Sequence, residues 1–229
     1  MKIIASDFDG TIHRKGTISE RDKNAVLEWQ KKGNHFGIVT GRGPDIFETI
    51  KKHNITLDYA IAYNGAIVLD GEGNVLYEDW FERGIEKEYM DFAYSFDYEF
   101  AHEYNCNVDP SDTGKEHQLA ILLKNDNDAK ELAELLNKKF EGRLSSYSNG
   151  EWINTVKYGT SKATGIQHYA ELKNIEMKDI YTVGDFFNDL PMLQAFNGYV
   201  VETGHPDLIK LIGNVCTDIA HLTEIADKN

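Results

Sequence analysis

Apolar and amphipathic segments alternate along the start of the chain. Mostly apolar runs at residues 2–6, 35–39 and 59–62 predict buried strands, and apolar residues at helical spacing predict helices at 19–33 and 44–53. Strands that are joined through helices pair in parallel, with right-handed crossovers. The first part of the chain therefore predicts an open parallel sheet.

The pattern changes after this alternation. Apolar runs at 66–69 and 74–77, separated by a glycine-rich turn, predict a β-hairpin. From about residue 81 the chain repeats the order helix, strand, strand, and an Asn149-Gly150 turn separates the last two strands. This αββαββ unit ends near residue 157.

Strand–helix alternation then returns. Residues 160–172 predict a helix and 179–183 a strand. A helix at 186–196 must have Pro191 in its first turn or break there. Short runs at 199–201 and near Val215 are the last predicted strands.

The predicted fold class is α/β. A Rossmann-like parallel-sheet core is formed by residues 1–80 and 158–229, and the αββαββ unit at 81–157 is a second α/β domain inserted into it.

Composition restricts the partners of this fold. The net charge of −14 argues against nucleic acid, because phosphate backbones require a basic face. No apolar run is long enough to span a membrane, and the N-terminus lacks a signal-peptide pattern. Cys106 and Cys216 are far apart with no partner motif, so we expect no disulfide framework and a cytoplasmic location.

Polar residues recur at the predicted strand ends. Asp7 and Asp9 follow the first strand, Thr40-Gly41 the second, and Gly184-Asp185 a later one, while Lys162 lies in the opening turn of a helix. Each alone is more typical of a turn, a solvated lysine or a helix cap. Together they predict one crevice at the carboxyl edge of the sheet, where paired acids can act as nucleophile and proton carrier.

The order of these motifs resembles the haloacid dehalogenase (HAD) superfamily of phosphatases. Within it, the chain resembles the Cof-type, IIB-like subgroup, which has an α/β cap inserted between the second and third motifs. Asn64-Gly65-Ala66 also looks like a tripeptide that is usual in this subgroup. The four matching motifs are Asp7-Phe8-Asp9-Gly10-Thr11, Val39-Thr40-Gly41-Arg42, Ser161-Lys162 and Gly184-Asp185-Phe186-Phe187-Asn188-Asp189.

The resemblance implies a role for each motif residue. Asp7 would be the nucleophile that forms an aspartyl-phosphate, and Asp9 the acid and base that serves the leaving group and then water. Mg²⁺ is the expected cofactor, since hard oxygen ligands suit it and an acidic protein must offset the charge of a phosphate. The metal ligands implied are Asp7, Asp9 through its backbone carbonyl, Asp185, and Asp189 through bound water. The phosphate-binding residues implied are Thr40, Gly41, Lys162 and Asn188.

The predicted substrate is a small phosphorylated metabolite, a sugar or polyol phosphate. Acidic residues outnumber basic ones in the insert, which disfavours polyanions such as nucleoside triphosphates. Asn154 stands where the subgroup leads us to expect an acid, and Tyr147 and Trp152 are candidates for the inner face of the cap.

Two other functions remain open from the sequence. One is a phosphoryl transferase or mutase of the same fold, and the other is a non-catalytic signalling or sensor module that is phosphorylated on an aspartate. Arg42 either enters the site or pairs with a surface acid, and we favour the second. The oligomeric state is not predicted.

Overall fold

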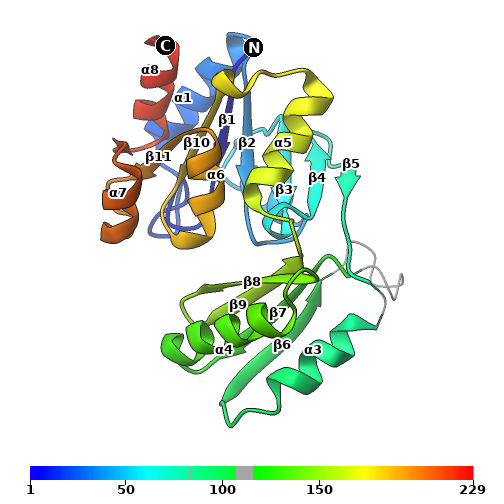
Figure 1. The fold of residues 1–229 in the computed structure, drawn as a ribbon. Coiled ribbons are helices and arrows are strands. Elements are labelled where there is room, and N and C mark those ends of the chain that lie inside the picture. Colours follow the sequence, from blue (N-terminus) through cyan, green and yellow to red (C-terminus); the bar gives the residue numbers. More distant parts are fainter. Residues whose placement is uncertain (83, 107–115, 229) are drawn as a thin grey trace.

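The computed structural model describes residues 1–82, 84–106 and 116–228, and the side chains of 102–106 lie outside the described part. Two sheets organise these residues (Figure 1). The larger sheet has eight strands in the order β12-β11-β10-β1-β2-β3-β4-β5. These strands are β1 (Ile3–Ser6), β2 (His35–Val39), β3 (Tyr59–Ala62), β4 (Ile67–Asp70), β5 (Val75–Glu78), β10 (Ile180–Gly184), β11 (Asn197–Val201) and β12 (Val215–Cys216).

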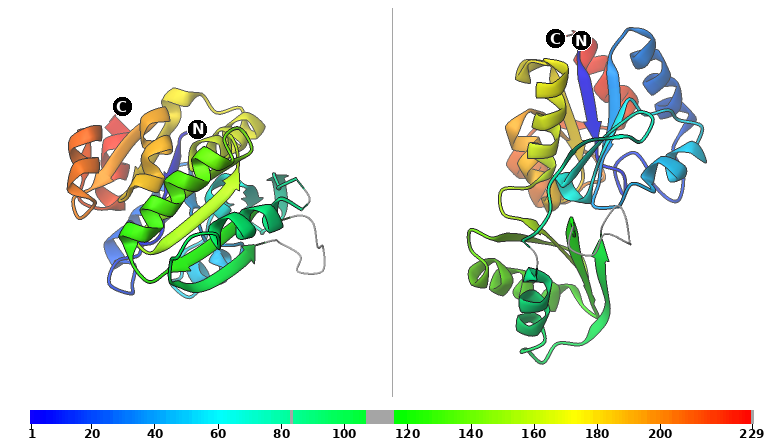
Figure 2. Two further views of the ribbon diagram at one scale, coloured as in Figure 1. Left: turned by 60° about the horizontal axis from the view of Figure 1, so that its bottom comes forward. Right: turned by 90° about the vertical axis from the view of Figure 1, so that its right-hand side faces the viewer.

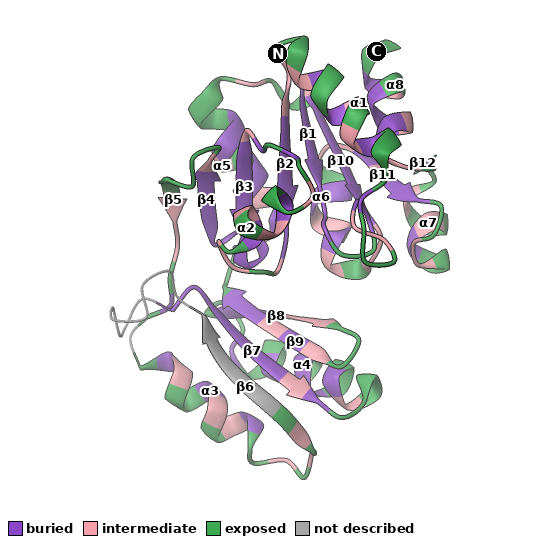
Figure 3. Ribbon diagram, turned by 180° about the vertical axis from the view of Figure 1, so that it is seen from behind, coloured by how far each residue is buried: buried purple, intermediate pink, exposed green. Residues whose placement is uncertain are grey.

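Strand β1 lies at the centre of the parallel part of this sheet. It pairs in parallel with β10 on one side and with β2 on the other, while β4 and β5 form the antiparallel hairpin at one edge. All four β1 residues are buried, as expected for a strand covered on both faces (Figure 3). This arrangement confirms the predicted fold class.

Helices cover both faces of the large sheet. Val26 and Trp29 of α1 pack with residues of α2 and α8 into one apolar cluster. Ile166 and Tyr169 of α5 pack with residues of α6 and α7 into a second cluster on the other face. These helices are α1 (Glu20–Lys31), α2 (Ile46–Lys51), α5 (Lys162–Lys173), α6 (Leu190–Ala195), α7 (Pro206–Ile212) and α8 (Ile219–Lys228).

The smaller sheet is antiparallel, with the order β6-β7-β9-β8. Its elements are α3 (Ile85–Ala93), β6 (Phe100–Cys106), β7 (Gln118–Leu123), α4 (Asp126–Lys139), β8 (Leu144–Asn149) and β9 (Trp152–Lys157). Leu119, Ile121 and Ile153 pack with residues of α3 and α4, so both helices lie against one face of this sheet. We call this unit the cap.

The other face of the cap sheet is turned toward the core (Figure 2). Because side chains alternate along a strand, Gln118, Ala120 and Leu122 of β7 lie opposite to Leu119 and Ile121. Gln118 contacts core residues, which fixes the orientation of the whole face.

Two connections join the cap to the core, and a residue of the first connection, Asp79, binds the end of β9 and the second connection. Asp79, directly after β5, accepts hydrogen bonds from Lys157 Nζ at 2.7 Å and from Thr160 Oγ1 at 3.1 Å. The predicted domain boundaries, after residue 80 and before residue 158, lie within these connections and stay a prediction.

Most predicted elements are present, with small changes at their ends. Ser19 caps α1 by accepting from the backbone N–H of Asp22. Pro191 lies in the first turn of α6, after a short 3₁₀ turn, η3 (Phe187–Asp189). Helices α7 and α8 were not predicted. The thiol of Cys216 is free and buried, and the Cys106 side chain lies outside the described part. Among the described residues, no helix is long and apolar enough to cross a membrane.

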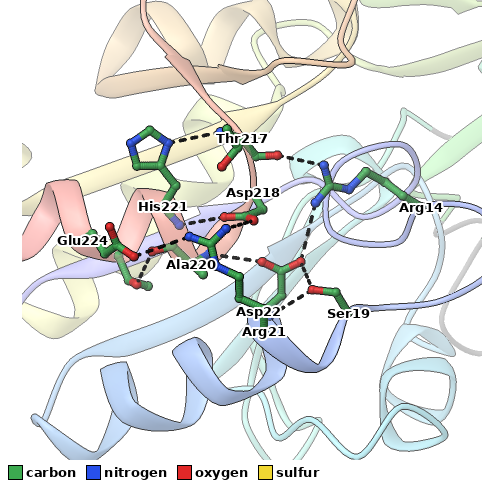
Figure 4. Close-up of polar contacts among 10 residues, drawn as sticks. Arg14, Ser19, Arg21, Asp22, Thr217, Asp218, Ala220, His221 and Glu224 are labelled. Carbon is green, nitrogen blue, oxygen red and sulfur yellow. Dashed lines mark hydrogen bonds and ion pairs between the residues drawn. The ribbon is translucent and has the colours of Figure 1, made fainter.

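A buried carboxylate holds the loop after β1 against the end of the chain (Figure 4). Asp22 of α1 is almost fully buried and accepts from the backbone N–H of Ala220 at 3.1 Å. Arg14 of the loop lies 3.6 Å from Asp22 and donates to the Thr217 carbonyl at 2.9 Å. The loop that follows the first motif is thus attached to α1 and to the segment directly before α8.

Candidate active site

The four motifs meet at one edge of the large sheet. Asp7 follows β1, Thr40 follows β2 and Asp185 follows β10, and these three strands are neighbours in the sheet. Parallel strands end at the same edge, so their C-terminal residues converge there. Lys162, the first residue of α5, lies at the same edge.

Lys162 connects two of the motifs directly. Its ammonium group donates to Asp7 Oδ1 and to Asp189 Oδ1, each at 2.6 Å. The Lys162 side chain is fully buried. A buried charge without partners is very costly, so the two carboxylates explain how the lysine can lie in the interior.

The capping box at the start of α5 fixes the position of this lysine. Ser161 accepts from the backbone N–H of Thr164, and the Thr164 hydroxyl accepts from the backbone N–H of Ser161. The tripeptide glycine Gly65 packs against the same turn, where a Cβ atom would lie 2.0 Å from the Ser161 carbonyl oxygen. The hydrogen bonds of the capping box at the start of α5 therefore direct the Lys162 side chain toward the strand ends.

Burial and charge shift the pKa values of this cluster. Burial alone would lower the pKa of Lys162, but Asp189 and Asp7 together raise it, so the ammonium group stays protonated. Burial raises the pKa of Asp7 well above its ordinary value, Lys162 opposes this, and Asp189 and Asp185 add to it. Burial and then Asp189 raise the pKa of Asp185 to about 6, against the hydrogen bond from Thr11.

The same carboxylates fit a magnesium ion. Asp7, Asp185 and Asp189 each offer an oxygen atom, and these atoms lie within 4.8 Å of one another. Three carboxylates against one ammonium group leave negative charge in excess, and a divalent cation with a preference for oxygen would offset it. The ligand chemistry therefore suits Mg²⁺.

Asp189 differs from the other two carboxylates because both of its oxygens already accept hydrogen bonds. Oδ1 accepts from Lys162, and Oδ2 accepts from the backbone N–H groups of Asp185 and Phe186 at 2.9 and 3.1 Å. Gly184 accommodates this arrangement, since a Cβ atom there would lie 2.3 Å from Asp189 Oδ2. Asp189 holds both Lys162 and the loop that carries Asp185.

Gly10 and Thr11 of the first motif contact Asp185. Thr11 donates to Asp185 Oδ1 at 3.1 Å, and a Cβ atom at Gly10 would lie 2.2 Å from Asp185 Oδ2. Gly10 also has a φ of 85°, which favours glycine. The glycine therefore serves both the turn and the close approach of Asp185.

The carboxylate of Asp9 lies apart from the cluster. Arg42 binds it with two hydrogen bonds, from Nε at 2.6 Å and from Nη2 at 2.8 Å, and the Asp9 side chain is about half exposed. Arg42 therefore pairs with a partly exposed acid, as expected. This acid is Asp9, the predicted proton carrier. His13 also lies 3.8 Å from Asp9 and stacks on Phe8.

The predicted phosphate-binding residues lie at the same edge. Thr40 is buried and its hydroxyl oxygen accepts from the backbone N–H of Arg42 at 3.1 Å. The Gly41 carbonyl accepts from Gln118 of the cap at 3.1 Å. Asn188 is half-buried in η3, beside Asp189. Sequence reasoning did not identify Gln118, because nothing in its local sequence indicates a contact with the second motif.

Comparisons with known proteins agree with this geometry. The family model of haloacid dehalogenase-like hydrolases matches residues 4–109 and 96–221. The 5-amino-6-(5-phospho-D-ribitylamino)uracil phosphatase YcsE of Bacillus subtilis is 23% identical, over 95% of this chain and 90% of its own length. The phosphatase YwpJ of the same species is 22% identical, over 95% and 94%.

Solved structures of the same family have the same fold. A haloacid dehalogenase-like hydrolase from B. subtilis superimposes with a TM-score of 0.81 at 19% identity, covering 99% of each chain. The HAD-superfamily phosphatase BT1666 from Bacteroides thetaiotaomicron gives a TM-score of 0.80 at 20% identity, covering 100% of this chain and 94% of its own. The predicted enzyme class, a phosphoric monoester hydrolase, agrees with these relatives. The match to the family model extends over nearly the whole chain, which therefore belongs to the haloacid dehalogenase-like hydrolases.

Proposed function

We propose that this chain is a Mg²⁺-dependent phosphatase that hydrolyses a small sugar or polyol phosphate through an aspartyl-phosphate on Asp7. The observation that carries the proposal is the buried cluster in which Lys162 binds both Asp7 and Asp189 beside Asp185. Such a cluster concentrates opposite charges at a strand edge and is of little use to a purely structural core.

In this mechanism Asp7 attacks phosphorus with the oxygen that does not bind Lys162. Lys162 and the Thr40 hydroxyl donate to the phosphoryl oxygens, and Asn188 and the Gly41 N–H complete the phosphate site. Asp7, Asp185 and the Asp9 backbone carbonyl would hold a Mg²⁺ ion, and the ion would offset the charge of the phosphoryl group. Asp189 positions Lys162 and the Asp185 loop, and it would assist a bound metal through water.

In its protonated form Asp9 donates a proton to the leaving alkoxide, and the carboxylate that remains takes a proton from the water that hydrolyses the aspartyl-phosphate. Its carboxylate must turn from Arg42 toward the crevice to do so. The ion pair of Asp9 with Arg42 is bidentate and about half exposed, and it must open before Asp9 can serve the leaving group.

The core-facing side of the cap supports an uncharged leaving group. Along the three strands β7, β8 and β9, the described residues on this face are neutral. They are Gln118, Ala120, Leu122, Ser145, Tyr147, Asn149, Trp152, Asn154 and Val156. A neutral wall offers hydroxyl and amide groups to a polyol and no cation to a second phosphate. The relative YcsE, named for a ribitylamino substrate, supports the same class.

The test is a screen of the purified protein against phosphorylated metabolites, with Mg²⁺ and with a chelator. We expect turnover of a monophosphate that depends on Mg²⁺, and a loss of more than about 1,000-fold in kcat for Asp7→Asn, because the nucleophile is removed. Asp91→Asn, at an exposed acid of α3, is the matched control and should retain full activity.

Chelator-resistant turnover, or near-normal turnover by Asp7→Asn, would contradict the mechanism. Transfer of the phosphoryl group to an added sugar, rather than to water, would indicate the phosphotransferase alternative. Absence of turnover, with stable labelling of Asp7 by a phosphoryl donor, would indicate the signalling alternative.

A further inference from the structure

One side chain of the cap is inserted between two loops of the core. Gln118, the first residue of β7, is almost fully buried. Its Oε1 accepts from Asn64 Nδ2 at 2.8 Å, and its Nε2 donates to the Gly41 carbonyl at 3.1 Å. Its partners therefore belong to the loop after β2 and to the 3₁₀ turn η1 (Tyr63–Gly65) after β3.

The Gly41 carbonyl determines how both amides are oriented. A carbonyl only accepts, so Gln118 must present its NH₂ group to Gly41 and its oxygen to Asn64. Asn64 must then present its own NH₂ group to Gln118. Its Oδ1 remains buried and has no hydrogen-bond partner among the described residues. A rotation of either amide would place two acceptors or two donors against each other.

The core partners of Gln118 are held tightly. Asn64 has the left-handed backbone angles φ 52° and ψ 32°, and its N–H donates to the Thr40 carbonyl at 2.9 Å. A Cβ atom at Gly41 would lie 3.0 Å from Asn64 Nδ2. The cap contact is thus formed with backbone that is already packed against the second motif.

Gln118 and Thr40 bind opposite ends of one peptide group. The carbonyl of the Gly41–Arg42 peptide accepts from Gln118, and its N–H donates to Thr40 Oγ1 at 3.1 Å. Because the Thr40 oxygen accepts this bond, its own hydrogen is directed elsewhere and can be donated to a phosphoryl oxygen. The orientation of the peptide therefore determines where the Thr40 hydroxyl donates.

We propose that Gln118 is a positioning residue: when the cap is docked, it orients the Gly41–Arg42 peptide, and through that peptide the Thr40 hydroxyl, for the phosphoryl group. The inference rests on the proposed function for the identity of the bound group. The unpartnered Asn64 oxygen makes the docked contact less favourable than a fully satisfied one, which suits a contact that opens to exchange substrate and product.

The informative substitution is Gln118→Glu. The side chain keeps its size and its acceptor for Asn64, but it places a second acceptor against the Gly41 carbonyl. We expect inorganic phosphate, titrated calorimetrically with Mg²⁺ present, to bind about tenfold more weakly, and kcat/KM to fall by a similar factor, the scale of one hydrogen bond. Gln167→Glu, at an exposed glutamine of α5, is the matched control.

A double-mutant cycle with Thr40→Val separates positioning from a structural role. If Gln118 acts through Thr40, then Gln118→Glu weakens phosphate binding in the wild type but adds almost nothing in Thr40→Val. Losses that multiply would overturn the inference, and so would unchanged phosphate binding by Gln118→Glu. If that variant does not fold, Gln118→Met replaces it in the same cycle.

The phosphate titration also separates this inference from the proposed function. A wild type that turns over no monoester but shows the coupled loss of phosphate binding would refute the phosphatase and retain the role of Gln118. Normal turnover with multiplicative losses would retain the phosphatase and refute the role of Gln118.

Discussion

The core residues at the strand ends and the cap face that is turned toward them differ in charge and in burial. The core side presents Asp7, Lys162 and Asp189 in a buried, hydrogen-bonded cluster. The cap side presents neutral side chains such as Tyr147 and Asn154, which are half-buried. Electrostatic interactions are strong where water is excluded, as around Lys162. An uncharged leaving group needs no charged partner on the cap. Under the proposed function, the charged core side supplies the chemistry, and the neutral cap face supplies the selectivity for the leaving group, apart from Gln118, which contacts the second motif.

After loss of the nucleophile, we expect substitution of Lys162 to cause the largest decrease in stability and in kcat. In Lys162→Met, Asp7 and Asp189 lose their shared cation and remain buried. We expect a loss of about 3–5 kcal/mol in the free energy of unfolding, measured in urea without Mg²⁺, because removal of one partner leaves uncompensated buried charge. We also expect kcat to fall by at least about 100-fold.

Lys87→Met is the control, because the ion pair of Lys87 with Asp91 is exposed to solvent. Equal stability of the two variants would mean that the buried cluster does not depend on its lysine. The buried ion pairs of Lys162 would then not distinguish the core side from the cap side.

The sequence could predict the core side because its chemistry follows local motifs. Asp7, Thr40 and Asp185 each end an apolar strand, and neighbouring parallel strands bring such ends together. Lys162 begins a helix that has an evident Ser161 cap. Each signal therefore lies within a few residues of the side chain that it positions.

The contacts that the sequence did not predict are long-range or weakly patterned. Gln118 meets Asn64 and Gly41, 54 and 77 residues away, only because the cap docks at one particular register. Arg42 binds Asp9 through the arrangement of two loops. Helix α7 is only seven residues long, too short to show a clear helical period.

The next largest expected effect is the dependence of Mg²⁺ stabilisation on pH. Asp185 has a pKa of about 6, so its carboxylate is ionised and able to bind a cation at neutral pH and is protonated below about pH 6. We expect Mg²⁺ to raise Tm at about pH 7.5, and this rise to decrease as the pH falls through about 6. Without metal the sign is opposite: the stabilising contribution of protonated Asp185 is complete below its unfolded pKa near 4 and is lost as the pH rises through about 6.

Thermal unfolding of Asp185→Asn, with and without Mg²⁺, measures how much of the rise in Tm depends on the Asp185 carboxylate. The variant should show almost no rise in Tm with Mg²⁺ at any pH. A rise that persists in the variant, or that is equally large at about pH 5 in the wild type, would place the metal elsewhere.

The smallest expected effect tests the neutral cap side. Asn154 lies in β9 between Ala120 and Tyr147 of the neighbouring strands, on the face that is turned toward the core. Asn154→Asp adds one negative charge there without a change in size. For a sugar bisphosphate we expect KM to rise about tenfold, and for a neutral sugar monophosphate about twofold, with kcat unchanged for both. The reason is that the added charge repels the second phosphate, which lies far from the reacting one.

Asn127→Asp, at an exposed position of α4, is the control and should change neither KM nor kcat. An equal rise in KM for the two substrates, or a fall in kcat, would show that Asn154 serves the chemistry of the core side rather than the selectivity of the cap.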